Sequence, residues 1–245
     1  MREIVFDTET TGVFPDHPEP DLRDRIVEIG CVEIVNLERT GREFHVYLNP
    51  DRSVPEEVVR VHGLTRDFLS KHRRFTEIVD SFMEFVGDAP LVAHNAAFDQ
   101  GFLNAELRRC GREPARGERF VDTLMIARKR FPGASCSLDA LAKRFQLDRY
   151  GFDLAARKGA GGHGALIDAR ILAEVYLQLK GGREQRLAFE AEAVTQSAGP
   201  QKAMHFTKRA PRATPLPVLL TPEEEAAHAA FIAGLGPNSL WLKAG

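Results

Sequence analysis

The chain has few cysteines and no long apolar segment. Its 245 residues include three cysteines, Cys31, Cys110 and Cys136, which are widely spaced and form no CxxC pair. This pattern argues against a disulfide framework or a cysteine-bound zinc ion and is typical of a reducing compartment. No apolar run approaches the ~20 residues that a membrane span requires, and the N-terminus lacks a signal-peptide pattern. We therefore expect a cytoplasmic protein.

A strong charge of one sign is also lacking. The chain carries 33 Lys and Arg against 35 Asp and Glu, a net charge of −2. Proteins that bind long stretches of duplex usually carry a basic surface, and this composition predicts none. If the protein acts on nucleic acid, we expect it to hold only a few nucleotides, or to rely on a partner that holds the substrate.

The order of the apolar patterns predicts an α/β domain over residues 1–182. Strand patterns come first, and the connection 36–41 is typical of a hairpin. Helices and short strands then alternate, which implies a mixed sheet. The predicted strands are 2–6, 25–35, 42–48, 91–93 and 119–121. The predicted helices begin with a capping box at 53–56 and continue at 75–86, 97–110, 123–130, 137–145 and 165–179.

The composition changes after residue 182. Residues 191–217 contain four prolines and a charge of +3, from four basic residues and one acidic, which is typical of a flexible linker. A capping box at 221–224 predicts a short helix, and an isolated short helix is marginal in water. We therefore expect Phe231, Leu240 and Trp241 to dock on a partner, the alternative being local packing on the first domain.

Acidic and imidazole side chains occur at three places in a set order. Asp7 and Glu9 are two apart on a strand, so they share one face. Asp99 lies in the first turn of one predicted helix, and Asp168 lies about one turn into another. His163 precedes that second helix in a glycine-rich loop that permits movement. Taken alone, each is explained by a solvated strand end, a favourable helix N-terminus or chance. Together they supply the oxygen ligands and the base with which two Mg²⁺ ions could cut a phosphodiester bond.

These segments resemble a known family. The sequences D-T-E-T-T-G (7–12), H-N-A-A-F-D (94–99) and H-G-A-L-I-D-A (163–169) resemble the DEDDh branch of the DEDD 3′→5′ exonucleases. Further segments are similar to the epsilon (proofreading) subunits of bacterial DNA polymerase III. They include F-H-V-Y-L (44–48), V-H-G (61–63), S-L-D-A-L (137–141) and I-L-A-E-V-Y-L (171–177). The resemblance covers about residues 2–182 and resumes at 221–241.

The resemblance implies a ribonuclease H-like fold, with a five-stranded mixed sheet flanked by helices, and a set of roles. Asp7 would bridge two divalent cations, Mg²⁺ or Mn²⁺, with Glu9 and Asp168 completing one site and Asp99 holding the second cation through water. His163 would accept a proton from the attacking water, releasing a 5′-mononucleotide from a DNA 3′ end. Because a base must be neutral and imidazoles titrate near ~6.5, we expect activity to rise from about pH 6 to about pH 8.

Two more residues match positions near the 3′-terminal nucleotide in that family. They are Glu57 and His62. The alternative for Glu57 is a solvated helix face, and the alternative for His62 is a simple turn residue. Residues 13–25 and 150–162 depart from the family pattern, so loop contacts and the closure of the loop that carries His163 stay open.

The resemblance also implies partners. Residues 183–190 contain E-Q-R-L-A-F, which is similar to a motif that binds the sliding clamp (beta), with Leu187 and Phe189 entering its pocket. Glu184 stands where Gln is expected, and the alternative is a continued helix. Residues 218–245 would bind the polymerase catalytic (alpha) subunit, and whether a small third core subunit binds is left open.

Two other functions are compatible with parts of the pattern. A stand-alone DEDDh exoribonuclease would use the same site residues, but it has no need of the linker and C-terminal segment. A non-catalytic scaffold between polymerase and clamp would need the tail, but it has no need of Asp7, Glu9, Asp99, His163 and Asp168. The sequence therefore favours a proofreading exonuclease.

Overall fold

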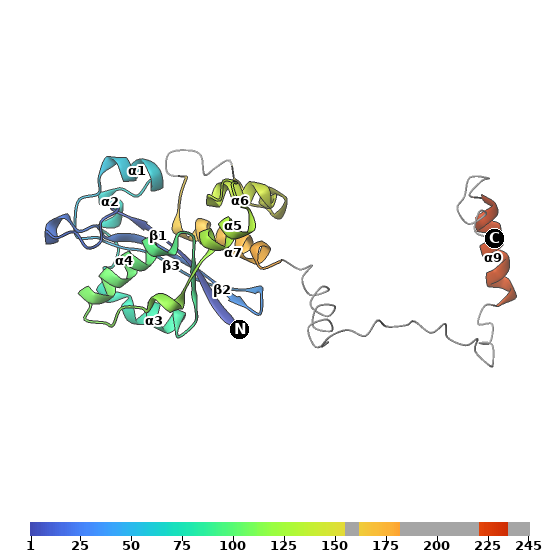
Figure 1. Cartoon of the computed structure of the whole chain (residues 1–245), viewed down its shortest axis with the longest axis horizontal. Helices are drawn as coiled ribbons and strands as arrows, with labels where there is room; N and C mark the ends of the chain where they lie inside the picture. Colours follow the sequence, from blue (N-terminus) through green and yellow to red (C-terminus); the bar gives the residue numbers. More distant parts are fainter. Residues whose placement is uncertain (155–161, 182–220, 235–245) are drawn as a thin grey trace. The chain divides into compact units, whose positions relative to one another are not determined.

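The computed structural model describes residues 1–154, 162–181 and 221–234. The chain divides into two units, Met1–Gln196 and Ser197–Gly245. The first contains a sheet with helices packed on both of its faces, and in the second the described part is a single helix, α9 (Pro222–Gly234) (Figure 1). Thr221 caps α9, since its hydroxyl accepts the Glu224 N–H while the Glu224 carboxylate accepts the Thr221 N–H, as the predicted capping box requires.

The sheet has five strands in the order β3-β2-β1-β4-β5. The first three pair as an antiparallel meander, and β4 and β5 extend the sheet in parallel to β1. This confirms the predicted five-stranded mixed sheet. The strands are β1 (Arg2–Thr10), β2 (Ile26–Val35), β3 (Glu38–Tyr47), β4 (Leu91–Ala93) and β5 (Phe120–Asp122).

Two local predictions are wrong. The hairpin turn is shorter than 36–41, because Asn36 and Leu37 both adopt positive φ and Val35 already pairs with Glu38. Such a two-residue turn matches the right-handed twist of the strands. The capping box at 53–56 is absent: helix α1 (Glu56–His62) begins after Pro55, and no side chain caps it.

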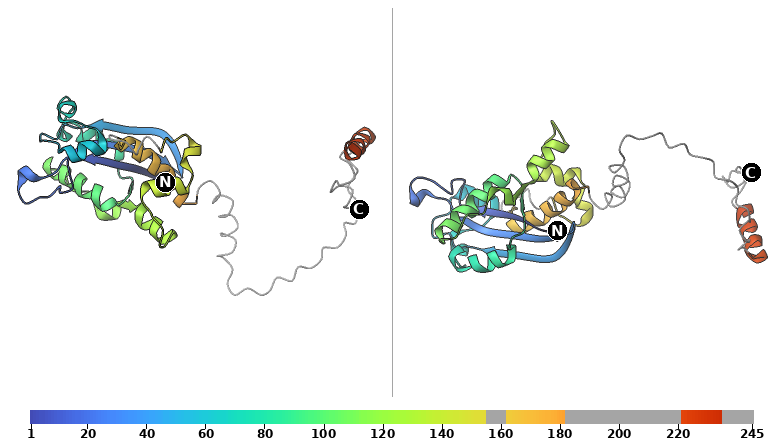
Figure 2. Two further views of the ribbon diagram at one scale, coloured as in Figure 1. Left: turned by 90° about the horizontal axis from the view of Figure 1, so that it is seen from above. Right: turned by 60° about the horizontal axis from the view of Figure 1, so that its bottom comes forward.

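Helices cover both faces of the sheet (Figure 2). One face packs against α3 and α4 in a core that includes Ile4 and Phe6, and the other packs against α7 around Val5. A third apolar cluster joins α5 and α6 to the later turns of α7. The remaining helices are α2 (Arg66–Leu69), α3 (Val79–Val86), α4 (Ala96–Arg109), α5 (Thr123–Arg130), α6 (Leu138–Arg144) and α7 (Ala165–Leu179).

The alternation of β1 decides where its acidic residues lie. Ile4 and Phe6 face α3 and α4, whereas Val5 faces α7. Because side chains alternate along a strand, Asp7 and Glu9 continue the face of Val5 toward α7. The same strand therefore packs the core with its first half and presents carboxylates with its second half.

Candidate active site

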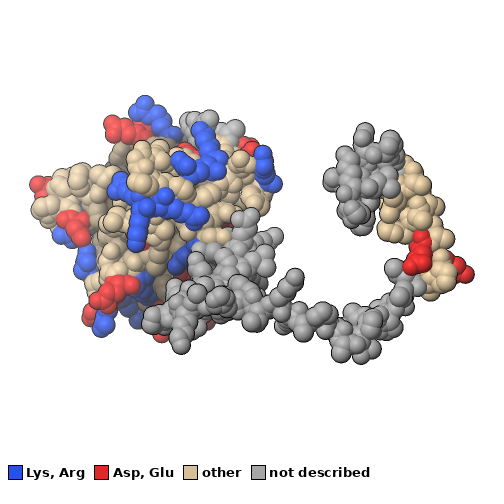
Figure 3. Space-filling model, turned by 45° about the vertical axis from the view of Figure 1, so that its right-hand side comes forward, with Lys and Arg blue, Asp and Glu red and all other residues tan. Residues whose placement is uncertain are grey.

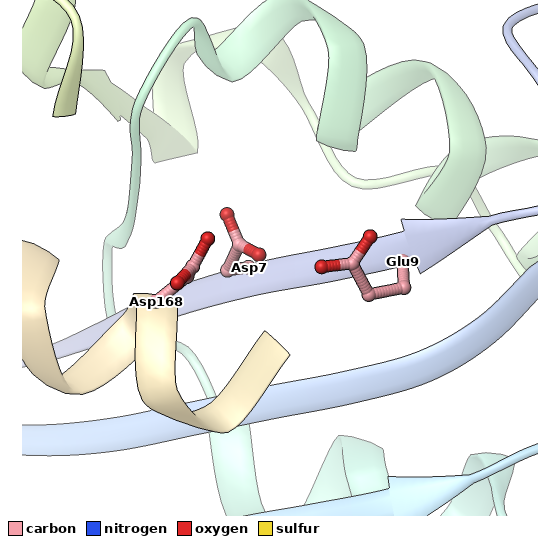
Figure 4. A group of neighbouring side chains, drawn as sticks. All are labelled: Asp7, Glu9 and Asp168. Carbon is pink, nitrogen blue, oxygen red and sulfur yellow. The ribbon is translucent and has the colours of Figure 1, made fainter. Parts of the chain in front are cut away.

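Three of the predicted carboxylates meet at one point. Asp7 and Glu9 project from β1, and Asp168 projects from the first turn of α7 toward them (Figure 4). One ligand oxygen from each lies within 4.8 Å of the others. Asp168 is only 5% exposed, and burying like charges together is unfavourable unless a cation compensates them. These oxygen donors fit a divalent cation such as Mg²⁺.

A glycine on the neighbouring strand allows this approach. Gly30 of β2 pairs with Asp7, and the first turn of α7 lies directly over it. A Cβ at Gly30 would lie 2.2 Å from the Leu166 backbone nitrogen, a distance that no side chain tolerates. Gly30 is not among the predicted site residues, although a glycine inside a strand pattern is itself a signal of close backbone approach.

His163 lies beside the carboxylates. Its Nδ1 is 3.1 Å from Asp168 Oδ2, and its side chain is 35% exposed against 8% for that of Asp168. Its backbone N–H donates to the Val61 carbonyl in α1 at 3.4 Å. The imidazole therefore faces solvent at the edge of the acidic cluster, held between α7 and α1.

Asp99 reaches β1 from the opposite side. It lies in the first turn of α4, is 4% exposed, and accepts a hydrogen bond from Thr8 Oγ1 at 2.8 Å. Burial raises the pKa of Asp99 to about 7, an effect that the Thr8 hydroxyl opposes and Asp122 reinforces. Asp99 is not one of the three residues whose oxygens converge, so its role as a ligand stays a prediction, and Thr8 is the residue that fixes its carboxylate.

His94 and Asn95 shape the turn that leads into α4. His94 Nδ1 lies 2.9 Å from Thr123 Oγ1, and Asn95 adopts a left-handed conformation while its N–H donates to Asp122 Oδ1. Burial lowers the pKa of His94, which favours a neutral imidazole. These contacts give the two residues a role in positioning the turn.

The two residues expected near the 3′-terminal nucleotide lie on α1. Glu57 is exposed in its first turn. His62 ends the helix and is buried, its Nδ1 accepting the Leu64 N–H at 3.0 Å. Burial lowers the pKa of His62, and the Thr10 backbone partly offsets this, which links the end of α1 to the end of β1.

A further carboxylate lies next to Glu9 and was not predicted. Glu28 pairs with Glu9 across β1 and β2, is 3% exposed, and contacts His45 Nε2 at 2.7 Å. Its oxygens would lie 3.8 Å from a Cβ at Gly164, the residue before α7. Glu28 therefore adds negative charge beside the cluster. The sequence signal is an acidic residue among the apolar residues of a buried strand.

The tail residues are described only in part. Leu187, Phe189, Leu240 and Trp241 lie outside the described residues. Phe231 is 65% exposed on α9, a helix without a buried residue.

Over the described ranges, no helix combines the length and apolar character needed to cross a membrane.

Comparison with known proteins gives consistent results. The model of the exonuclease family (RNase_T) matches residues 4–176. DNA polymerase III subunit epsilon of Escherichia coli K12 is 42% identical over 249 residues, covering 98% of this chain and 97% of the relative. The same subunit of Rickettsia conorii is 41% identical over 236 residues, covering 95% of each chain.

The fold is also found among solved structures. The nuclease domain of 3′hExo, a DEDDh family member bound to rAMP, superposes with a TM-score of 0.56 at 16% identity. The match covers 73% of this chain and 90% of that domain. At this identity, the likeness shows a shared fold.

Proposed function

Because the chain belongs to the exonuclease family and, within it, to the DNA polymerase III epsilon subunits, we propose that it proofreads for a bacterial replicative polymerase. It removes nucleotides from the 3′ end of a primer strand and releases 5′-mononucleotides. The observation that carries this proposal is the convergence of Asp7, Glu9 and Asp168 with His163 at its edge.

The carboxylates would hold the cofactor. Asp7 would contribute to both cation positions, with Glu9 and Asp168 at one of them and Asp99 at the other. When bound, two divalent cations, Mg²⁺ or Mn²⁺, activate the attacking water and stabilise the charge on the leaving oxygen. Asp99 lies in the first turn of α4 with its carboxylate on Thr8, and a nearby cation would favour the ionised form that burial disfavours.

His163 accepts the proton of the attacking water. Its Nδ1 lies within hydrogen-bond distance of the Asp168 carboxylate, an acceptor, so Nδ1 carries the proton in the neutral ring and Nε2 is the basic atom. Its side chain is partly exposed at the edge of the carboxylate cluster. Glu57 and His62 on α1 contact the 3′-terminal nucleotide in the same proposal.

The tail provides the second half of the function. Residues 1–182 form the exonuclease domain, 183–190 bind the sliding clamp through Leu187 and Phe189, and 191–217 act as a linker. Residues 218–245 bind the polymerase catalytic subunit through Phe231, Leu240 and Trp241. The exposed Phe231 on a helix with no buried residue supports a docking role. The complex works at the replication fork in the cytoplasm.

One experiment tests the catalytic proposal. Asp7→Ala should abolish Mg²⁺-dependent digestion of single-stranded DNA while the melting temperature stays near that of the wild type, and Asp88→Ala, an exposed acid between α3 and β4, is the control. Isothermal titration with Mn²⁺ should show weakened binding in Asp7→Ala alone. Digestion at the wild-type rate would refute the assignment of the ligands.

The same assay separates the alternatives. Matched DNA and RNA oligonucleotides are digested in parallel, and a preference for RNA would identify an exoribonuclease. A wild-type chain without Mg²⁺-dependent hydrolysis of either would identify a scaffold.

A further inference from the structure

Basic side chains gather on the outer surface formed by α5, α6 and the 3-10 helix η4 (Leu147–Tyr150). We call this surface the basic face. All its members are exposed: Arg128, Lys129, Arg130, Lys143, Arg144 and Arg149. Between residues 123 and 150 these six are opposed by two acids, Asp139 and Asp148, a net +4 in a chain whose total is −2. Figure 3 shows the gathering of Lys and Arg over these elements.

The basic face differs from other basic surfaces of the domain in its pairing. Elsewhere many arginines are matched by carboxylates, as Arg25 is by Glu106 and Arg170 is by Glu43. Within residues 1–154, 162–181 and 221–234, none of the six forms an ion pair with a carboxylate. Their charge is therefore available to an external anion.

Two members have structural duties as well. Arg130 donates to the carbonyls of Gln178 and Leu179 at the end of α7. Arg144 lies over the Phe131 ring, with its guanidinium 4.6 Å from the centroid. Among the residues that the structure describes, Arg128, Lys129, Lys143 and Arg149 make no such contact, so their substitution tests the charge without removing known packing.

The basic face begins close to the acidic site. Helix α5 starts at the sheet edge that carries the site, where Thr123 contacts His94 and Asp122 contacts Asn95. Arg128 follows Thr123 by five residues, or about 7.5 Å along a helix, and its charge contributes to the lowered pKa of His94. The later turns of α7, whose first turn carries Asp168, pack against α5 and α6.

We propose that the basic face binds the phosphates of the DNA strand under digestion, upstream of the scissile bond. This inference rests on the proposed function. A strand whose 3′ end lies at the carboxylates presents a row of phosphates, and exposed Arg and Lys are the groups that bind them. The expectation of no basic surface, drawn from the net charge, is therefore wrong, because the average hides a local concentration.

A matched pair of triple variants tests the proposal in the full chain. The first removes three charges from the basic face: Arg128→Ala, Lys129→Ala and Lys143→Ala. The control removes three from α4 and the loop after it, against the opposite face of the sheet: Arg108→Ala, Arg112→Ala and Arg116→Ala. Both lower the net charge equally. Each is assayed on a long oligo(dT) and on the p-nitrophenyl ester of thymidine 5′-monophosphate, which has no upstream phosphate.

The basic-face variant should raise KM for oligo(dT) by about tenfold at low salt with little change in kcat. The slope of log KM against log salt concentration should fall by about 2, at ~0.7 per lost contact with a single strand. Hydrolysis of the ester should be unchanged. The control variant should match the wild type on both substrates.

Several outcomes would overturn the proposal. They are an unchanged KM for oligo(dT), an equal effect in the control, or an equal loss on the ester. The basic-face variant could bind oligo(dT) as tightly as the wild type and yet no longer be retained by the polymerase catalytic subunit. In that case the face docks a protein instead. If the wild type hydrolyses neither substrate, the proposed function fails, and fluorescence anisotropy of labelled oligo(dT) still decides whether the basic face binds DNA.

Discussion

Gly30→Ala should disable the site without touching any catalytic side chain. The added Cβ would lie 2.2 Å from the Leu166 nitrogen, whereas ordinary contact begins at 3.4 Å, so the first turn of α7 must move by about 1 Å. Asp168 lies in that turn and His163 just before it, so both should move with it, away from Asp7. A misplacement of ~1 Å can cost ~10²-fold in rate, equivalent to ~2.7 kcal/mol of transition-state stabilisation.

The assay is kcat on single-stranded DNA at saturating Mg²⁺, with thermal unfolding measured on the same sample. Overpacking costs ~1–3 kcal/mol of stability, so a lowered but cooperative melting transition is expected. Gly117→Ala is the matched control, because its Cβ would meet only the Gln100 side chain at 3.5 Å. A folded Gly30→Ala protein with wild-type kcat would refute the claim that this contact sets the geometry of the site.

Three further predictions concern the hydrogen bond to Asp99, the titration of Asp99 and the C-terminal tail. Thr8→Val removes the hydrogen bond to Asp99. Because a hydrogen bond to a charged group is worth ~1.5–3 kcal/mol, kcat should fall by roughly 10–100-fold. Thr8→Ser keeps the hydroxyl and should retain activity. Without divalent cations, burial raises the pKa of Asp99 from 3.8 to about 7, so the folded state binds the proton more tightly and loses stability as the pH rises through that window. Asp99→Asn should therefore melt several degrees above the wild type at pH 8 in EDTA. Near pH 4 the two proteins should melt at the same temperature. The reverse order would contradict the burial argument. Deleting 218–245 should abolish co-purification with the polymerase catalytic subunit and leave exonuclease activity intact, and loss of both would refute the two-part architecture.

Much of the fold was predictable because local patterns and tertiary packing agree. The helix 165–179 is found at the predicted residues, since its apolar face and the glycines on either side mark both ends. The hairpin turn is shorter than the predicted connection 36–41 because Leu37 adopts a positive φ that few non-glycine residues accept. The cap of α1 was misplaced because Pro55 precedes the helix instead of lying in its first turn.

The sequence by itself determined the identities of the site residues and the face on which some of them lie. Asp7 and Glu9 must share a side of β1 because side chains alternate along a strand, whatever surrounds it. Their meeting with Asp168 was decided only by the tertiary structure, because it depends on how closely α7 approaches Gly30. The tertiary structure also decided the hydrogen bond from Thr8 to Asp99, because these residues are far apart in the chain. It likewise decided the basic face, because its residues lie on separate helices.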